Sequence, residues 1–397
     1  MTAGELGASV ERAPASVPEV SAAGDRSASG GSRHDDLRGR GTQRLVGPDV
    51  VRAIALIGVI LMNYHGYLII SGGERADNLW GRFFDPWTGP LGTRFAATFV
   101  LTAGVGVTLF TRGAIGNRAA VAAKRWVLLR RGLLLYGFGL LFYEIWQGSI
   151  LPYYGLMFCL GALLVTLPSV VVAATGLGAA LAGAGIQWWS IEARWNGDST
   201  NWLHNPPAGS PRGLLFDMFV NGTHPLFPWL AFFCAGILIG RVLRTDWWRP
   251  VAIALGATLW AFATLLSNVL TQTDRTPLTV ELARDDPFGR GLLYTASALG
   301  TSLVAFTVIY TLATWFPASA PVRMFAHAGQ MTLTLYVAHA LVFNFVVHWM
   351  GWVRPAGLDL ALVFALGYWV IAVALGAAWH HWFRIGPAEW LYRKLGG

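Results

Sequence analysis

The stretch that decides the fold class runs from Val50 to Ser71 and reads VVRAIALIGVILMNYHGYLIIS. Arg52 is its only Lys, Arg, Asp or Glu residue. About 20 consecutive, predominantly apolar residues suffice to cross the hydrocarbon core of a bilayer as a helix. The stretch therefore predicts a transmembrane helix.

The composition of the whole chain agrees with this. Of the 397 residues, 54% are hydrophobic and 13% are charged, whereas soluble globular proteins carry roughly 25% charged residues. This composition excludes a soluble enzyme, a disordered scaffold and a nucleic-acid-binding module, although the net charge is +8. Cys159 and Cys234 lie in apolar runs without the spacing of metal ligands or of a disulfide framework. No metal cofactor is expected.

Apolar segments of similar length follow one another along the rest of the chain, separated by short polar loops. The expected spans are 50–71, 93–111, 130–148, 150–168, 169–189, 225–242, 250–271, 291–314, 330–350 and 359–380. We therefore predict an all-α integral membrane protein with about ten transmembrane helices, forming one domain over residues 47–397. Residues 1–46 show no apolar periodicity and predict a disordered tail.

Lys and Arg residues are distributed unequally between the two sides of these helices. With the tail on the inside, 18 of them fall near cytoplasmic ends and nine on the opposite side. Since cytoplasmic loops carry the excess of positive charge, both termini are expected in the cytoplasm. The polar loops 72–92, 190–224 and 272–290 would then lie outside, as parts of a substrate site or as plain connectors.

The first predicted helix carries three polar residues of interest. Arg52 and Asn63 are eleven residues apart, about three helical turns, so they share a face. His65 points away from that face unless the helix loosens near Tyr64. It is either a functional group in a shared cavity or an interfacial histidine bonded to a neighbour.

His339 lies near the middle of the span 330–350, and Tyr336 precedes it by three residues on the same side of the helix. An ionisable residue at this depth is costly, so it marks a functional site or a buried pair. A neutral imidazole can serve as a general base. Alternatively, the Tyr–His pair holds two helices together. His224, at the start of the span 225–242, is a weaker candidate on the outer side.

Six cationic residues gather between the second and third spans: Arg112, Arg118, Lys124, Arg125, Arg130 and Arg131. Membrane topology alone accounts for positive charge in a cytoplasmic loop. The same cluster could bind the diphosphate of a nucleotide-type donor or anionic lipid.

Five motifs carry a resemblance to a known family. The segment 44–64, RLVGPDVVRAIALIGVILMNY, resembles the first-helix motif of the YeiB-like family of bacterial membrane proteins, a domain-of-unknown-function family. It is also similar to the start of heparan-alpha-glucosaminide N-acetyltransferase. Further matches follow in family order: GSILPYYG at 148–155, HPLFPWL at 224–230, GQMTLTLYVAH at 329–339 and FRIGPAEW at 383–390.

The resemblance implies a member of a transmembrane acyltransferase superfamily. The abundance of Trp, Arg, Gly and Ala with little Lys favours a high-GC bacterium and thus its plasma membrane. An enzyme of this superfamily moves an acyl group from cytoplasmic acyl-CoA, here with acetyl-CoA as the expected donor, to a sugar, glycolipid or glycosylated metabolite outside. Related sugar O-acyltransferases carry a His where this chain has Asn63. Asn63 is then the expected oxyanion donor, beside Tyr336, and His339 or His65 the general base. The CoA phosphates are expected to bind Arg52, Arg125, Arg130 and Arg131.

Two other functions remain open. The chain could be a transporter or exporter of a small molecule or glycoconjugate without covalent chemistry, since polar residues near the bilayer midplane suit a substrate pathway. It could also be a membrane scaffold, in which His339 and Asn63 are freely replaceable. Lipid is the partner in each case and nucleic acid in none, and the oligomeric state is not predicted. Binding of acyl-CoA separates the enzyme from both alternatives.

Overall fold

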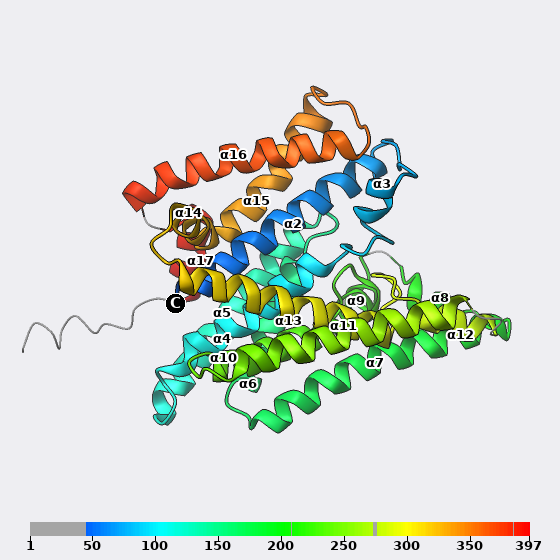
Figure 1. The fold of residues 1–397 in the computed structure, drawn as a ribbon, viewed down its shortest axis with the longest axis horizontal. Coiled ribbons are helices and arrows are strands. Elements are labelled where there is room, and N and C mark those ends of the chain that lie inside the picture. Colours follow the sequence, from blue (N-terminus) through cyan, green and yellow to red (C-terminus); the bar gives the residue numbers. More distant parts are fainter. Residues whose placement is uncertain (1–44, 208, 273–275, 384) are drawn as a thin grey trace, which may run out of the picture. The chain divides into compact units, whose positions relative to one another are not determined.

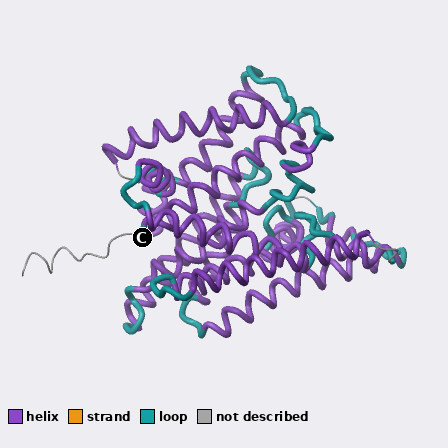
Figure 2. Tube along the Cα trace, viewed as in Figure 1, coloured by secondary structure: helices purple, strands orange, loops and turns teal. Residues whose placement is uncertain are grey.

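The computed structural model describes residues 45–397, apart from 208, 273–275 and 384. The described residues are mostly helical, and none of them lies in a strand (Figures 1 and 2). The all-α prediction is therefore confirmed. The predicted tail lies outside the described residues except for Leu45 and Val46, and Val46 already begins a helix.

Sixteen α-helices and two π-helical segments, η1 and η2, make up the described part of the chain. In chain order they are α2 (Val46–Ile70), α3 (Leu79–Phe83), α4 (Arg94–Arg112), α5 (Arg118–Phe142), α6 (Leu151–Leu164), α7 (Ser169–Trp195), α8 (Asn201–His204), α9 (Pro211–Phe216), η1 (Asp217–Asn221), α10 (Leu226–Val242), α11 (Trp248–Gln272), α12 (Pro277–Ala283), α13 (Leu292–Trp315), α14 (Ala320–Gly329), α15 (Thr332–Phe343), η2 (Asn344–Trp349), α16 (Leu358–Phe383) and α17 (Pro387–Gly396).

The helices support a multi-pass membrane protein, but not the full count of spans. Among the described residues, seven helices are long and apolar enough to cross a membrane. The number rises to eight if the pair Pro211–Asn221 and Leu226–Val242, bent by 54°, forms one span. The expected count of about ten is not confirmed, and the side on which each terminus lies stays a prediction.

The predicted spans 130–148 and 150–168 account for the difference between the ten expected spans and the eight that the described part of the chain allows. Helix α5 begins at Arg118, so its first 14 residues carry five of the six cationic residues and only the remainder is apolar. Helix α6 has 14 residues, and at 1.5 Å per residue it is only about 21 Å long, shorter than the ~30 Å hydrocarbon core. The two helices pack against each other as a hairpin.

Helices α2 and α4 lie at the centre of the bundle. Of the most apolar window of α4, 72% is buried, against 17% for α11 and 28% for both α7 and α16. Helix α2 packs against α4, α13, α14, α15 and α16. Figure 1 shows α16 and α7 at opposite edges, with α2 between them. The outer helices therefore present their apolar side chains to lipid, and polar groups on α2 are enclosed by protein.

Glycines allow α4 and α10 to cross with their backbones in contact. A Cβ atom at Gly236 would lie 1.9 Å from the carbonyl oxygen of Leu101, and one at Gly104 would lie 2.1 Å from that of Phe233. Small residues are what allow helices in lipid to approach closely. This crossing sets the distance between α10 and the centre of the bundle.

Replacing one of these glycines tests the crossing. We expect Gly236→Ala to lower the thermal unfolding temperature in detergent, because its methyl group would push α4 and α10 apart at a cost of about 1–3 kcal/mol. Gly178→Ala on α7 is the control, since a Cβ there meets nothing within 4 Å. It should be neutral or slightly stabilising, because Ala favours a helix over Gly. Equal losses in the two variants would contradict the role of the crossing.

Candidate active site

A cavity of about 330 Å³ lies at the C-terminal end of α2, and we call it the Asn63 cavity. Helix α2 supplies Asn63 and Tyr67 to its wall, the segment after α3 supplies Trp87, and α15 supplies Tyr336. The remaining lining residues are Leu56, Val59, Met62, Gly66, Ile70, Pro86, Thr93, Phe95, Ala96, Phe99, Tyr143, Gln147, Gly148, Ile150, Thr223, His224 and Phe288. The wall is mostly apolar and aromatic with a few polar groups, as small-molecule sites are.

Asn63, a residue of this wall, contacts His339, which lies behind the wall. The side-chain nitrogen Nδ2 of Asn63 lies 3.2 Å from Nε2 of His339. The other ring nitrogen of His339, Nδ1, bonds to the backbone carbonyl of Tyr336. A carbonyl only accepts, so Nδ1 carries the proton and Nε2 is the acceptor. Asn63 therefore donates one amide N–H to His339, and its other N–H and its carbonyl oxygen remain for the cavity.

His339 itself does not line the cavity. It is completely buried, with the ring of Trp146 at 5.1 Å and that of Tyr336 at 4.9 Å. The hydroxyl of Tyr64 donates to its backbone carbonyl at 3.0 Å. A molecule in the cavity would therefore touch Asn63, with His339 behind it.

Two tyrosines hold the segment between α5 and α6 against the cavity. The hydroxyl of Tyr336 accepts a hydrogen bond from the backbone N–H of Ile150 at 3.1 Å. The hydroxyl of Tyr67 accepts one from the N–H of Gly148 at 2.7 Å, and its ring stacks on Trp146 with a centroid separation of 3.7 Å. Tyr336 thus shares the site with Asn63 and His339, and it also fixes a wall.

His65 points to a different place. Helix α2 continues without a break through Tyr64 and His65, so His65 stays on another face from Asn63. Its Nδ1 donates to the carbonyl oxygen of Phe84 at 2.8 Å, because that oxygen can only accept. Its Nε2 is buried without a hydrogen-bond partner among the described residues. His65 is not among the residues that line the Asn63 cavity.

The turn that begins at Asp85 supplies Pro86 and Trp87 to the cavity wall. One carboxylate oxygen of Asp85 accepts the N–H groups of Trp87 and Thr88 at 2.9 and 2.8 Å. The other lies 2.5 Å from Nε of Arg75. Burial acts to raise the pKa of Asp85, but the bonds from Arg75, Thr88 and Trp87 outweigh it and lower the pKa below its usual value.

Glu389 caps α15 from a distant part of the chain. Its carboxylate accepts the backbone N–H of Leu333 at 2.6 Å and the hydroxyl of Thr334 at 2.6 Å. These groups belong to the first turn of α15, where backbone N–H groups lack partners within the helix. Glu389 therefore helps to position the helix that carries Tyr336 and His339. The sequence motif contained it, but only the structure reveals this contact.

The four arginines expected to bind phosphate lie away from this cavity. Nε of Arg125 donates to the carbonyl of Ala162 at 2.5 Å. Arg130 and Arg131 donate to the carbonyls of Leu395 and Gly397 at 3.3 and 2.7 Å. On α2, Arg52 lies 4.0 Å from Asp49, with its guanidinium against Gly106. Arg125, Arg130 and Arg131 belong to α5, and Arg52 contacts α4 instead.

The structure also places His224 in the wall of the Asn63 cavity. Its Nδ1 lies 3.0 Å from the hydroxyl oxygen of Thr223, and its ring meets the edge of Trp229 at 4.5 Å. The sequence places His224 at the start of a span and of the motif HPLFPWL, but neither observation reveals its proximity to Asn63.

Two sequence families match this chain. Residues 44–270 match the family described as heparan-alpha-glucosaminide N-acetyltransferase, catalytic. Residues 254–396 match a family described as a protein of unknown function, DUF418. The uncharacterized protein YeiB of Escherichia coli (strain K12) is 26% identical over 400 residues, which cover 89% of this chain and 96% of that protein. The resemblance to the YeiB-like family is thus confirmed. Asn63 lies in the first match and His339 in the second, so their hydrogen bond joins the two matched regions.

Acid titration tests the Asp85 turn. Because the pKa of Asp85 in the folded protein lies below the unfolded value, its bonds stabilise the fold above about pH 4 and are lost as the pH falls through the folded pKa. We expect Asp85→Asn to lower the unfolding free energy by about 1.5–3 kcal/mol at pH 7, the range for a hydrogen bond to a charged group, with a smaller effect at pH 3. Melting temperatures of the native protein and of Asp85→Asn, taken between pH 7 and pH 3, measure this loss of stability.

The control for this titration is Asp77→Asn. The carboxylate of Asp77 pairs with Arg82 at 2.8 Å, but both side chains are exposed, and exposed pairs contribute little. If the two variants lost the same stability at pH 7, the turn would not be held by Asp85.

Proposed function

The chain belongs to the family of the heparan-alpha-glucosaminide N-acetyltransferase catalytic domain, and we propose on this basis that it is a membrane-embedded acyltransferase. It would move an acyl group, with acetyl as the favoured case, from cytoplasmic acyl-CoA to a sugar or glycosylated acceptor in the Asn63 cavity. The observation that carries the proposal is the family match over residues 44–270, which includes the helix that carries Asn63. The E. coli relative supports a bacterial plasma membrane as the location.

The cationic end of α5 suits the phosphates of acyl-CoA. Nε of Arg131 and Nη1 of Arg112 are buried without a hydrogen-bond partner among the described residues. Buried polar groups are rarely left unpaired, and such exceptions call for an explanation. The guanidinium of Arg131 lies over the ring of Phe110, where Lys124 also lies. A diphosphate here would pair with these charges by charge-assisted hydrogen bonds.

Helix α2 connects this region to the cavity. Arg52 lies on α2 eleven residues before Asn63. The hydroxyl of Tyr154 on α6 is buried and has no hydrogen-bond partner among the described residues. The ring of Tyr154 meets Phe99, a lining residue of the cavity, at 5.5 Å. We propose that the pantetheine arm follows this line and delivers the thioester to Asn63.

At the cavity, Asn63 would act on the carbonyl of the thioester. Its second N–H is free of His339 and can donate to the oxygen on which negative charge develops. The acceptor hydroxyl or amine attacks the carbonyl carbon, the C–S bond breaks, and the CoA sulfur leaves with a proton. His339 would hold the amide of Asn63 in the donating orientation.

A base must take the proton of the attacking group. His224 lines the cavity, whereas Nε2 of His339 accepts from Asn63 and reaches the acceptor only if that amide moves. We therefore propose His224 as the first candidate for the base, with His339 as the alternative. The aromatic wall, with Trp87 and Tyr67, suits the apolar face of a sugar ring.

Binding of acetyl-CoA to the protein in nanodiscs tests the donor site. We expect Arg131→Ala to weaken the affinity about 10- to 100-fold, which corresponds to the loss of one charge-assisted hydrogen bond. Arg354→Ala, at an exposed residue on another loop, is the control. If the native protein bound no acetyl-CoA at millimolar concentration, the proposal would fail, and transport through the same cavity would become the leading explanation.

Release of CoA in the presence of glucosamine tests the reaction. We expect Asn63→Ala to lower the rate about 10²–10³-fold, as does the loss of an oxyanion donor elsewhere, with little change in acetyl-CoA affinity. Asn268→Ala on the exposed face of α11 should leave the rate unchanged. His224→Gln should abolish activity if His224 is the base, whereas an active His224→Gln beside an inactive His339→Gln would point to His339. Full activity in Asn63→Ala would contradict this role.

A further inference from the structure

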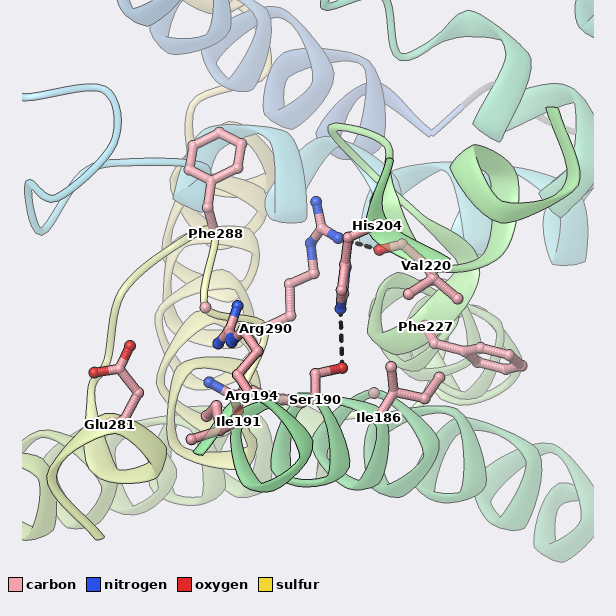
Figure 3. Close-up of a pocket in the computed structure, with 13 residues that line it drawn as sticks. Ile186, Ser190, Ile191, Arg194, His204, Val220, Phe227, Glu281, Phe288 and Arg290 are labelled. Atoms are coloured by element: carbon pink, nitrogen blue, oxygen red, sulfur yellow. Dashed lines mark hydrogen bonds between the residues drawn. The ribbon is translucent and has the colours of Figure 1, made fainter. Parts of the chain in front are cut away.

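A second cavity, of about 260 Å³, lies between α7, α8, η1, α12 and the loop before α13. We call it the Ser190 cavity. Gln187, Ser190 and Arg194 of α7 line it, together with His204, Phe288 and Arg290 (Figure 3). Its volume falls just below the usual range for drug-sized ligands, so it suits a small molecule.

Three side chains from separate elements form a chain of hydrogen bonds in this wall. The hydroxyl oxygen of Ser190 lies 2.9 Å from Nε2 of His204, and Figure 3 shows the ring turned toward it. Nδ1 of His204 lies 3.1 Å from Oδ1 of Asn221. Nδ2 of Asn221 donates to the carbonyl of Leu203 at 2.5 Å.

The last of these bonds fixes the direction of the others. Because Nδ2 of Asn221 must face the carbonyl of Leu203, its oxygen Oδ1 faces His204, and an amide oxygen only accepts. Nδ1 of His204 therefore carries the proton, and Nε2 has a lone pair. The hydroxyl of Ser190 then donates to Nε2. A nucleophile bonded to a base that a third group orients is the general signature of nucleophilic catalysis.

The charge state of His204 agrees with this arrangement. Burial lowers the pKa of His204, and the positive charges of Arg194 and Arg290 lower it further against the bond to Asn221, which raises it. The imidazole is therefore neutral near pH 7 and able to accept a proton.

One donor for a developing oxyanion, the guanidinium of Arg194, lies beside Ser190. Gln187 and Arg194 lie three residues before and four residues after it, so all three share one face of α7. The side-chain oxygen of Gln187 is buried and has no hydrogen-bond partner among the described residues. Arg290 bonds to the carbonyls of Val220, Asn221 and Gly222, which holds the segment that carries Asn221. The cation of Arg194 can donate to the acyl oxygen of a ligand, and the unpaired oxygen of Gln187 can accept an N–H or O–H group of the same ligand.

We propose that Ser190 and His204, positioned by Asn221, form a second catalytic centre that accepts acyl groups from small acyl esters. This centre needs no acyl-CoA and is separate from the chemistry proposed at Asn63. Phe288 lines both cavities, so the two sites are neighbours.

The reaction proceeds in two balanced steps. The oxygen of Ser190 attacks the ester carbonyl while its proton passes to Nε2 of His204. The bond to the alcohol then breaks, and the alcohol leaves with that proton, so that Ser190 carries the acyl group as an ester. Water, deprotonated by His204, attacks this ester, and the proton returns to Ser190 as the carboxylic acid leaves. The net reaction is hydrolysis of the ester.

The test uses the full chain in nanodiscs with p-nitrophenyl acetate. We expect a burst of p-nitrophenolate and an acetyl group on Ser190, located by mass spectrometry of the peptide. Ser190→Ala should abolish the burst, and His204→Gln should slow it at least 100-fold, the lower range for a general base. Ser199→Ala, at an exposed serine of the following loop, is the matched control.

The positioning role of Asn221 is tested by asking whether a conservative substitution restores the burst. Asn221→Ala should slow the burst, and Asn221→Asp, which still offers an oxygen to Nδ1 of His204, should restore much of it. A merely structural Asn221 would not show this difference. The melting temperature of each variant shows whether the fold is intact, and the burst needs no acetyl-CoA, so its outcome stays separate from that of the Asn63 proposal.

Three results would overturn the second centre: no burst in the native protein, an undiminished burst in Ser190→Ala, or acetylation of another residue.

Discussion

In the interior of a membrane bundle, a polar side chain must find its partner within the protein, because lipid offers none. The bond between Asn63 and His339 meets this requirement at the centre of the structure. It joins α2, which packs against five other helices, to α15. The hydroxyl of Tyr64, one residue further along α2, bonds to the backbone of His339, so the two helices are held by a side chain and a main chain at once. Any shift of α15 along α2 would leave several buried polar groups unpaired.

Loop segments supply the rest of the wall of the Asn63 cavity. One wall of the Asn63 cavity comes from a turn tied by Asp85, another from the segment tied by Tyr67 and Tyr336, and a third from residues 223–224. For the first two walls, hydrogen bonds to backbone N–H groups, and not apolar contact alone, fix the segment. The cavity therefore has a defined shape at the end of α2.

The sequence predicts the parts of this arrangement that depend on one helix. The stretch Val50 to Ser71 predicts α2, and the separation of eleven positions places Arg52 and Asn63 on one face. The same helical geometry turned His65 away, and the structure agrees because α2 does not loosen there. Apolar composition predicts two full spans for the hairpin of α5 and α6, because it does not reveal that α6 ends after 14 residues. Ser190, His204 and Asn221 belong to three separate elements, α7, α8 and η1, and form hydrogen bonds with one another. No periodicity in the sequence connects them.

The cap that Glu389 places on α15 has a consequence for the way the protein is made. Leu333 and Glu389 are separated by the whole of α16, which must be inserted into the membrane before the carboxylate can reach the first turn of α15. Until then, the N–H groups of that turn lack their partner and the helix is not anchored at its start. The order of synthesis thus delays the completion of the Asn63 cavity until the last helices are in place, so partly inserted chains lack the finished site.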